Sequence, residues 1–297
     1  MIEVCEVGPR DGLQNEATLL SAQTKADMIA RLIDSGIRYI EAVSFVNPRV
    51  VPQMADAEVV LSLLPKRKDV RYAGLVLSRS GLERALQTDV DVLHVVTTTS
   101  DTFNQRNVKR TVEQAVAELT PVIQEGRQSG KDVVGVLGTA FGCPFEGDVP
   151  LATVTRVAER FLQAGCTALT LADTTGMANP LQVQQIVGAF STAFGSSLSL
   201  GLHFHNTRGL GLANVLAGYQ AGVRRFDASL GGLGGCPFAP KAVGNVCTED
   251  MVNMFCGMNL DTGTNLPKLL ETAAWMERII GRPLDGMMLK AGIQKNR

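Results

Sequence analysis

Residues 154–172 read VTRVAERFLQAGCTALTLA, and this stretch decides the fold. Up to Ala164 the apolar residues recur every three or four positions, which predicts an amphipathic helix. Gly165 follows, at a place where a left-handed helix end favours glycine. The apolar run 168–172 then predicts a buried strand. The stretch is therefore one unit of helix, glycine and strand.

The same unit recurs along the chain. Helical periodicity also covers residues 24–35, 111–128 and 181–194, and Gly36, Gly130 and Gly222 stand just past helical segments. Short apolar runs predict eight strands, at residues 2–7, 39–45, 71–77, 92–98, 133–139, 168–172, 198–205 and 225–230. Eight strands alternating with helices in 297 residues predict an α/β fold, a (β/α)8 TIM barrel.

A doubly wound open sheet is the alternative fold. Its usual nucleotide fingerprint, G-x-G-x-x-G, is missing from the first strand-to-helix turn, residues 8–12. Beyond the eighth strand, helical patterns near residues 249–256 and 266–280 predict extra C-terminal helices near the barrel mouth. No linker-like composition separates them, so residues 1–297 are expected to form a single catalytic domain.

The composition excludes several classes of protein. The net charge is −1, and residues 66–68 are the longest basic run, which argues against nucleic acid as a partner. The chain has no apolar stretch of membrane-spanning length and no signal-peptide pattern, which predicts a cytoplasmic protein without membrane contact. The six cysteines include no C-x-x-C pair, as suits a reducing compartment.

Polar residues collect at the predicted carboxyl ends of the strands, where TIM barrels carry their active sites. They are Arg10 and Asp11 after the first strand, Glu41 and Ser44 on the second, Asp173 after the sixth, and His203 and His205 on the seventh. Residues two apart on a strand project from one face, about 6.6 Å apart along it, so both imidazoles can bind one cation. With Asp11 as a carboxylate ligand, the pattern predicts a Lewis-acid metal site.

Some of these residues also have a purely structural interpretation. Arg10 and Asp11 could form an ion pair that caps the following turn, and Glu41 could be the buried partner of Arg10. Asp173 could cap the turn at residues 174–176. His94 lies in the middle of a predicted strand with no second ligand nearby, and we interpret it as a core residue.

Two cysteines also lie at predicted strand ends or loops. Cys236 stands in a glycine-rich stretch, where a thiol can act as a nucleophile or a proton donor. Cys143 follows the fifth strand, and its pattern favours neither packing nor chemistry.

Two longer motifs point to a family. Residues 7–16, VGPRDGLQNE, and 232–239, GLGGCPFA, resemble the 3-hydroxy-3-methylglutaryl-CoA lyase family of DRE-TIM metallolyases. Matching segments at residues 40–46, 51–54, 142–147 and 244–250 follow in the same order, so the resemblance covers nearly the whole chain.

The resemblance implies a set of roles for these residues. A divalent cation, Mg²⁺ or Mn²⁺, would be held by Asp11, His203, His205 and Asn245. Arg10 would stabilise an enolate, Glu41 would support the site and Cys236 would transfer a proton. The substrate would be an acyl-CoA, 3-hydroxy-3-methylglutaryl-CoA, cleaved to acetyl-CoA and acetoacetate by a homodimer. Candidate substrate contacts are Gln14, Ser44, Asp173, Arg208 and Lys241.

The chain departs from the family pattern in two places. Asn206 stands where the family has aspartate after the second histidine, and a possible partner for a metal-bound imidazole is thereby lost. Arg208 and Lys241 add positive charge near the mouth. We therefore keep as alternatives a lyase for a related thioester such as citramalyl-CoA, a condensing synthase of the same superfamily, and a metal-binding barrel without catalysis.

Overall fold

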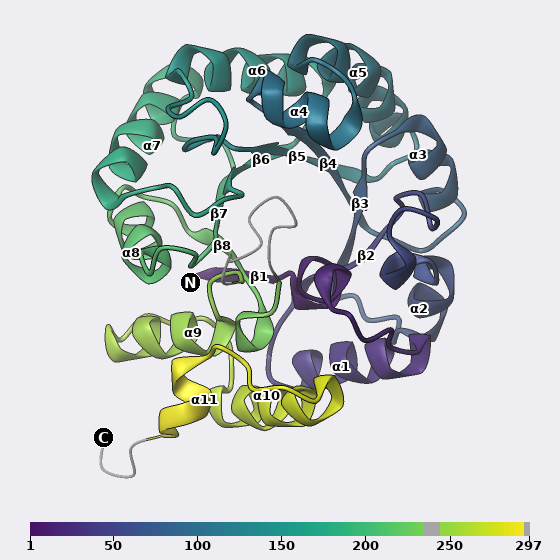
Figure 1. Ribbon diagram of the computed structural model, residues 1–297, viewed down its shortest axis with the longest axis vertical. Helices are drawn as coiled ribbons and strands as arrows, with labels where there is room; N and C mark the ends of the chain where they lie inside the picture. Colours follow the sequence, from purple (N-terminus) through teal and green to yellow (C-terminus); the bar gives the residue numbers. More distant parts are fainter. Residues whose placement is uncertain (235–243, 294–297) are drawn as a thin grey trace.

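Eight parallel strands close into a barrel in the computed structural model, which describes residues 1–234 and 244–293. Each strand pairs with the next along the chain, and β1 pairs with β8 to complete the ring, as Figure 1 shows. The strands are β1 Glu3–Glu6, β2 Tyr39–Ser44, β3 Arg71–Val76, β4 Val92–Thr98, β5 Asp132–Gly138, β6 Ala168–Asp173, β7 Leu200–Phe204 and β8 Arg225–Ala228. The predicted TIM barrel is confirmed.

Helices follow the strands and form the outer ring (Figure 1). They are α1 Ala22–Asp34, α2 Ala57–Leu63, α3 Arg79–Ala85, α4 Asp101–Val108, α5 Val112–Gln128, α6 Leu151–Ala164, α7 Pro180–Phe194, α8 Gly211–Gln220, α9 Thr248–Gly257, α10 Leu266–Ile280 and α11 Met287–Ala291. Helices α10 and α11 extend the chain past the barrel units. The segment between them reaches the rim, where the Asp285 N–H donates to Gly231 O at 3.0 Å. The C-terminal region thus borders the mouth, as predicted.

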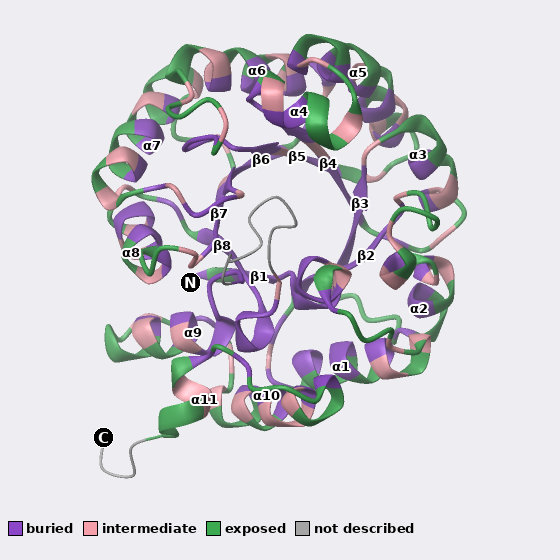
Figure 2. Ribbon diagram, in the orientation of Figure 1, coloured by how far each residue is buried: buried purple, intermediate pink, exposed green. Residues whose placement is uncertain are grey.

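The core has two layers, and Figure 2 shows buried residues along the strands and the helix faces that meet them. The larger layer lies between strands and helices and includes Ile29, Phe161 and Phe226. The smaller lies inside the barrel and includes Tyr39 and Val92, because alternate strand residues face inward. Within the described residues, no helix is long and apolar enough to cross a bilayer.

Several predicted strands were one to three residues too long, and at β7 and β8 the difference shapes the site. Strand β7 ends at Phe204, and His205 instead forms an isolated antiparallel bridge with Asn245. Strand β8 ends at Ala228, because Leu230 begins a short 3₁₀ turn in which Gly231 has a φ of 65°. No helical range was predicted from the sequence for α2, α3, α4, α8 or α11.

The turn after β1 presents Arg10 and Asp11 at the rim. Residues Gly8–Gly12 form one turn of π-helix, in which the Gly12 N–H donates to Val7 O at 3.2 Å. The N–H groups of Arg10 and Asp11 donate to the same oxygen, at 3.1 and 2.7 Å. Such single π-turns are rare and often mark functional sites.

Candidate metal centre and active site

Asp11, His203 and His205 meet at the carboxyl-terminal rim of the barrel. One ligand atom from each lies within 4.8 Å of the other two. Asp11 Oδ2 is 3.9 Å from His203 Nε2 and 4.0 Å from His205 Nε2. All three side chains are buried, so they converge on one small, enclosed volume. One carboxylate and two imidazoles suit a divalent cation, and the cluster could hold one.

Asn245 is brought to the same place by the backbone pairing of residues 244 and 246 with residues 206 and 204. Gly244 O accepts from the Asn206 N–H at 2.9 Å, and the Val246 N–H donates to Phe204 O at 3.0 Å. This pairing sets the Asn245 amide nitrogen 2.7 Å from Asp11 Oδ2. Its amide oxygen is buried and has no hydrogen-bond partner among the described residues. A cation ligand would satisfy it, which fits the metal role that the resemblance implies.

Gly244 is required by this close return of the chain. A Cβ at Gly244 would lie 1.9 Å from Gly232 O and 2.2 Å from Gly234 O, a distance that backbone atoms cannot accommodate. Glycine therefore lets the two ends of the loop run side by side next to Asp11.

The surroundings of Asp11 and His205 favour the protonation states that bind a cation. Burial alone would raise the pKa of Asp11, but Arg10 and the two imidazoles overcome it and lower that pKa to about 2. Burial and the neighbouring His203 lower the pKa of His205 to about 4. At neutral pH Asp11 is thus ionised and the His205 imidazole is neutral, which are the forms that bind metal.

Asp227 orients His203 and was missed in the sequence. It lies on β8 at the register position opposite His203, and its Oδ2 is 3.3 Å from His203 Nδ1. Burial opposes the charged imidazole, but this hydrogen bond leaves the pKa of His203 raised overall. With its Nδ1 proton donated to Asp227, His203 presents Nε2 towards Asp11. An acidic residue on the strand next to the His-x-His pair was the signal available.

Arg10 lies between Asp11 and Glu41. Its Nη1 donates to Asp11 Oδ1 at 2.6 Å, and its Nε donates to Glu41 Oε2 at 2.6 Å, with a further ion pair from Nη2 to the same oxygen. The side chain is 11% exposed. The ion pairs of Arg10 with Asp11 and Glu41, which the structural interpretation predicted, are therefore present. They also fix the guanidinium beside the metal ligands, so the two interpretations coexist.

The remaining predicted contacts differ in their surroundings. Gln14 donates to Asp11 Oδ1 at 2.9 Å and so helps to orient that ligand. Ser44 is buried on β2, and its hydroxyl has no partner among the described residues. Arg208 donates from Nη1 to Thr175 O and Gly176 O, at 2.8 and 2.9 Å, and the residue is exposed. Cys236 and Lys241 lie outside the described residues.

Asp173 matches its structural interpretation closely. Its two carboxylate oxygens accept from the N–H groups of Met177 and Ala178, at 2.7 and 3.0 Å, and the side chain has no exposed surface. Asp173 therefore caps the turn after β6, and its contact with substrate stays a prediction.

Cys143 packs rather than faces the cluster. It is fully buried, and the Ser100 hydroxyl donates to its sulfur at 3.0 Å.

Asn206, the departure from the family pattern, accepts from the Gly211 N–H at 3.1 Å. Asp227 supplies a carboxylate to His203. This imidazole therefore has a carboxylate partner although position 206 is asparagine rather than aspartate.

Glu6 holds together the residues that follow β1 and β8 and the start of α9. Its Oε1 accepts from the N–H groups of Gly8 and Leu230, both at 2.8 Å, and its Oε2 accepts from the Thr248 hydroxyl at 2.6 Å. Burial outweighs these bonds and raises the pKa of Glu6 to about 8.

This raised pKa predicts a pH-dependent stability. Above pH 6.5 the unfolded chain has lost the Glu6 proton, whereas the folded protein keeps it until the pH passes about 8. The folded state binds more protons, so the free energy of unfolding falls by about 1–2 kcal/mol between pH 6.5 and 8. Glu6→Gln keeps the acceptor oxygen and should flatten this slope in thermal melts with Mg²⁺. An unchanged slope in the variant would contradict the assignment.

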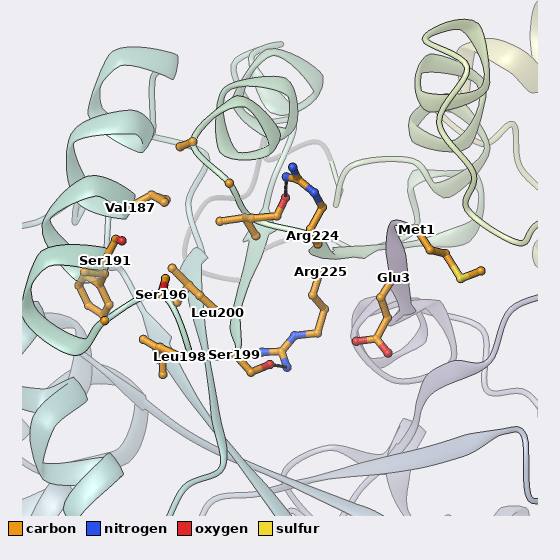
Figure 3. Close-up of a pocket in the computed structure, with 15 residues that line it drawn as sticks. Met1, Glu3, Val187, Ser191, Ser196, Leu198, Ser199, Leu200, Arg224 and Arg225 are labelled. Carbon is orange, nitrogen blue, oxygen red and sulfur yellow. Dashed lines mark hydrogen bonds between the residues drawn. The ribbon is translucent and has the colours of Figure 1, made fainter.

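A separate pocket lies at the other end of the barrel. It has a volume of about 530 Å³ and is lined by residues at the amino-terminal ends of strands, including Glu3, Ser199 and Arg225 (Figure 3). The Arg225 guanidinium is held there by Ser199 Oγ at 3.3 Å and Leu169 O at 2.7 Å. None of the described candidate site residues lines this pocket, so it is not part of the metal centre.

Comparisons with known proteins identify the family. The family model described as HMGL-like matches residues 1–276. Hydroxymethylglutaryl-CoA lyase YngG of Bacillus subtilis is 39% identical over 97% of this chain and 96% of its own length. The (R)-citramalyl-CoA lyase of Chloroflexus aurantiacus is 40% identical over 98% of this chain and 95% of its own length.

A solved structure gives the same result. An HMG-CoA lyase from Acinetobacter baumannii, in complex with coenzyme A and 3-methylmalate, has a TM-score of 0.95 and 42% identity. The match covers 100% of this chain and 97% of that one. By sequence and by fold, this chain belongs to the HMGL-like family of carbon–carbon lyases.

Proposed function

We propose that this protein cleaves 3-hydroxy-3-methylglutaryl-CoA into acetyl-CoA and acetoacetate with the help of a divalent cation. The observation that carries the proposal is the buried cluster of Asp11, His203 and His205 with Arg10 beside it. Relatives named as hydroxymethylglutaryl-CoA lyases support the substrate. The structure of a relative with coenzyme A bound supports an acyl-CoA as the substrate class.

The residues have distinct tasks in this reaction. Asp11, His203, His205 and Asn245 would hold the cation, which supplies Lewis-acid chemistry to the oxygens of the substrate. The C3 hydroxyl loses its proton and becomes a ketone as the C2–C3 bond breaks. The bonding electrons move to the thioester oxygen, and Arg10 stabilises the enolate more than the ground state.

We assign the proton that C2 then gains to the thiol of Cys236. The thiolate left behind takes up, through solvent, the proton that the C3 hydroxyl has released, so the cleavage involves no net gain or loss of protons. Family resemblance supports this role, and so do the positions of the residues on either side of its loop. Leu233 O accepts from the Asn245 amide at 3.1 Å, so the described loop ends adjoin the metal cluster.

Citramalyl-CoA is the second candidate substrate. A relative of equal similarity is an (R)-citramalyl-CoA lyase, and the A. baumannii enzyme binds 3-methylmalate. Arg208, anchored by one nitrogen to the β6 loop, has further N–H groups that could bind a substrate carboxylate. Lys241 is proposed as a second contact on the same charge argument.

The acyl preference is tested by comparing kcat/KM for the two thioesters with Mg²⁺ present. We expect a higher value for hydroxymethylglutaryl-CoA, with acetyl-CoA and acetoacetate as products. Arg208→Gln should raise KM more than it lowers kcat, because a binding contact is lost without change to the reacting bond. A clear preference for citramalyl-CoA would reassign the substrate, and turnover of neither would contradict the lyase proposal.

The finer properties follow the same relatives. We propose Mg²⁺ or Mn²⁺ as the cation, since carboxylate, amide and imidazole ligands suit both. We further propose a homodimer of single-domain catalytic subunits, a cytoplasmic location and a link to leucine degradation. Size-exclusion chromatography with light scattering tests the dimer.

A further inference from the structure

A line of buried hydrogen bonds leads away from Arg10 into the barrel. Glu41, which holds Arg10 through Oε2, also bonds through Oε1 to His94 Nδ1 at 2.8 Å. His94 Nε2 in turn lies 2.6 Å from the Tyr39 hydroxyl. The residues Tyr39, His94 and Glu41 are each at most 3% exposed. The Arg10 guanidinium, which lies beside the metal ligands, is therefore connected by hydrogen bonds to the interior of the barrel.

The barrel geometry explains how His94 reaches Glu41. Tyr39 and Glu41 are two apart on β2 and share the inward face, while His94 faces inward from β4. Ala73 on the intervening strand β3 is level with both Glu41 and Val92. Its small side chain lets a residue of β4 contact one of β2 across the interior.

The Glu41 carboxylate needs His94 to keep its orientation. One oxygen is taken by Arg10 and the other by the imidazole, so the carboxylate cannot rotate without breaking a bond. Burial alone would raise the pKa of Glu41, but Arg10 and then His94 leave it lowered, so the group is an anion. Since the anion only accepts, Nδ1 of His94 carries the shared proton.

We propose that His94 is a positioning residue, which sets the direction of the Arg10 guanidinium through Glu41. The inference rests on the proposed lyase function, in which Arg10 stabilises the enolate. His94 does not touch the substrate in this account. A displacement of the catalytic guanidinium by about 1 Å is enough to lower a rate by about 100-fold, so an indirect partner can matter.

Two substitutions of the same shape separate positioning from packing. Asparagine and leucine side chains have the same number of heavy atoms and both branch at Cγ. Only the asparagine amide can replace Nδ1 as the donor to Glu41. We expect His94→Leu to lower kcat by about 10- to 100-fold with little change in KM, and His94→Asn to stay within about fivefold of wild type. Thermal melts verify that each variant is folded. If His94→Leu does not fold, His94→Gln, which replaces Nε2 rather than Nδ1, takes its place.

Tyr39→Phe serves as the stability control. It removes the bond on the far side of the imidazole and leaves the bond to Glu41, so the melting temperature should fall while kcat remains near wild type. If His94 only packs the core, His94→Leu and His94→Asn will lose stability without a difference in kcat. Equal kcat in the two variants would therefore overturn the proposal.

A readout without substrate distinguishes this proposal from the function on which it rests. The Arg10 Nε–H is buried against Glu41, and its exchange with solvent can be followed by NMR. We expect faster exchange in His94→Leu than in His94→Asn even if no thioester is cleaved. Inactive wild-type protein would count against the lyase function alone, whereas equal exchange rates would count against His94 as a positioning residue.

Discussion

Replacing Arg10 with glutamine is expected to lower kcat for thioester cleavage by about 100- to 1000-fold, or about 3–4 kcal/mol of transition-state stabilisation. The reason is that charge develops on the thioester oxygen only as the C2–C3 bond breaks. A fixed guanidinium interacts with that charge and much less with the neutral carbonyl. KM should therefore change far less than kcat, as steady-state kinetics will show.

Arg10→Lys is the informative comparison for this prediction. Lysine keeps the positive charge but lacks the planar fork that bonds Asp11 and Glu41 together. We expect a kcat between those of wild type and Arg10→Gln. A change in KM alone in Arg10→Gln would mean that Arg10 binds substrate without stabilising the enolate. Circular dichroism must first show that the variants fold, because both carboxylates lose a buried partner.

His205→Ala is expected to weaken cation binding and to lower kcat by more than about 100-fold, equivalent to about 2.7 kcal/mol. His205 is neutral and points a ring nitrogen towards Asp11, so its loss removes one donor from the cluster. Calorimetric titration with Mn²⁺ gives the affinity directly, and kinetics at saturating Mn²⁺ give the rate. A variant that binds Mn²⁺ and turns over as the wild type does would remove His205 from the site.

Much of the fold was readable in the sequence. The repeat of helix, glycine and strand predicted the closed barrel, because each βα unit carries its own local signals of periodicity and capping. The strand ends were less predictable. His205 leaves β7 because Asn245, forty residues later, pairs with it. Such long-range pairing leaves no trace in a local pattern.

The site shows the same division. The His-x-His pair and the Arg-Asp turn were visible because each is a short motif at a strand end. Asp227 and His94 were missed, since their importance depends on contacts across the barrel with His203 and Glu41. A lone histidine inside a strand has no local feature that tells a core residue from one beside an active site. Asp227 and His203 lie on different strands, and so do His94 and Glu41, so each pair meets only when the barrel closes.

The most direct test of the account is the cleavage of hydroxymethylglutaryl-CoA by wild-type protein before and after removal of divalent cations with EDTA. The account predicts that acetyl-CoA and acetoacetate form with Mg²⁺ or Mn²⁺, that EDTA stops their formation, and that excess cation restores it. Cleavage at an undiminished rate in EDTA would contradict the role given to Asp11, His203 and His205.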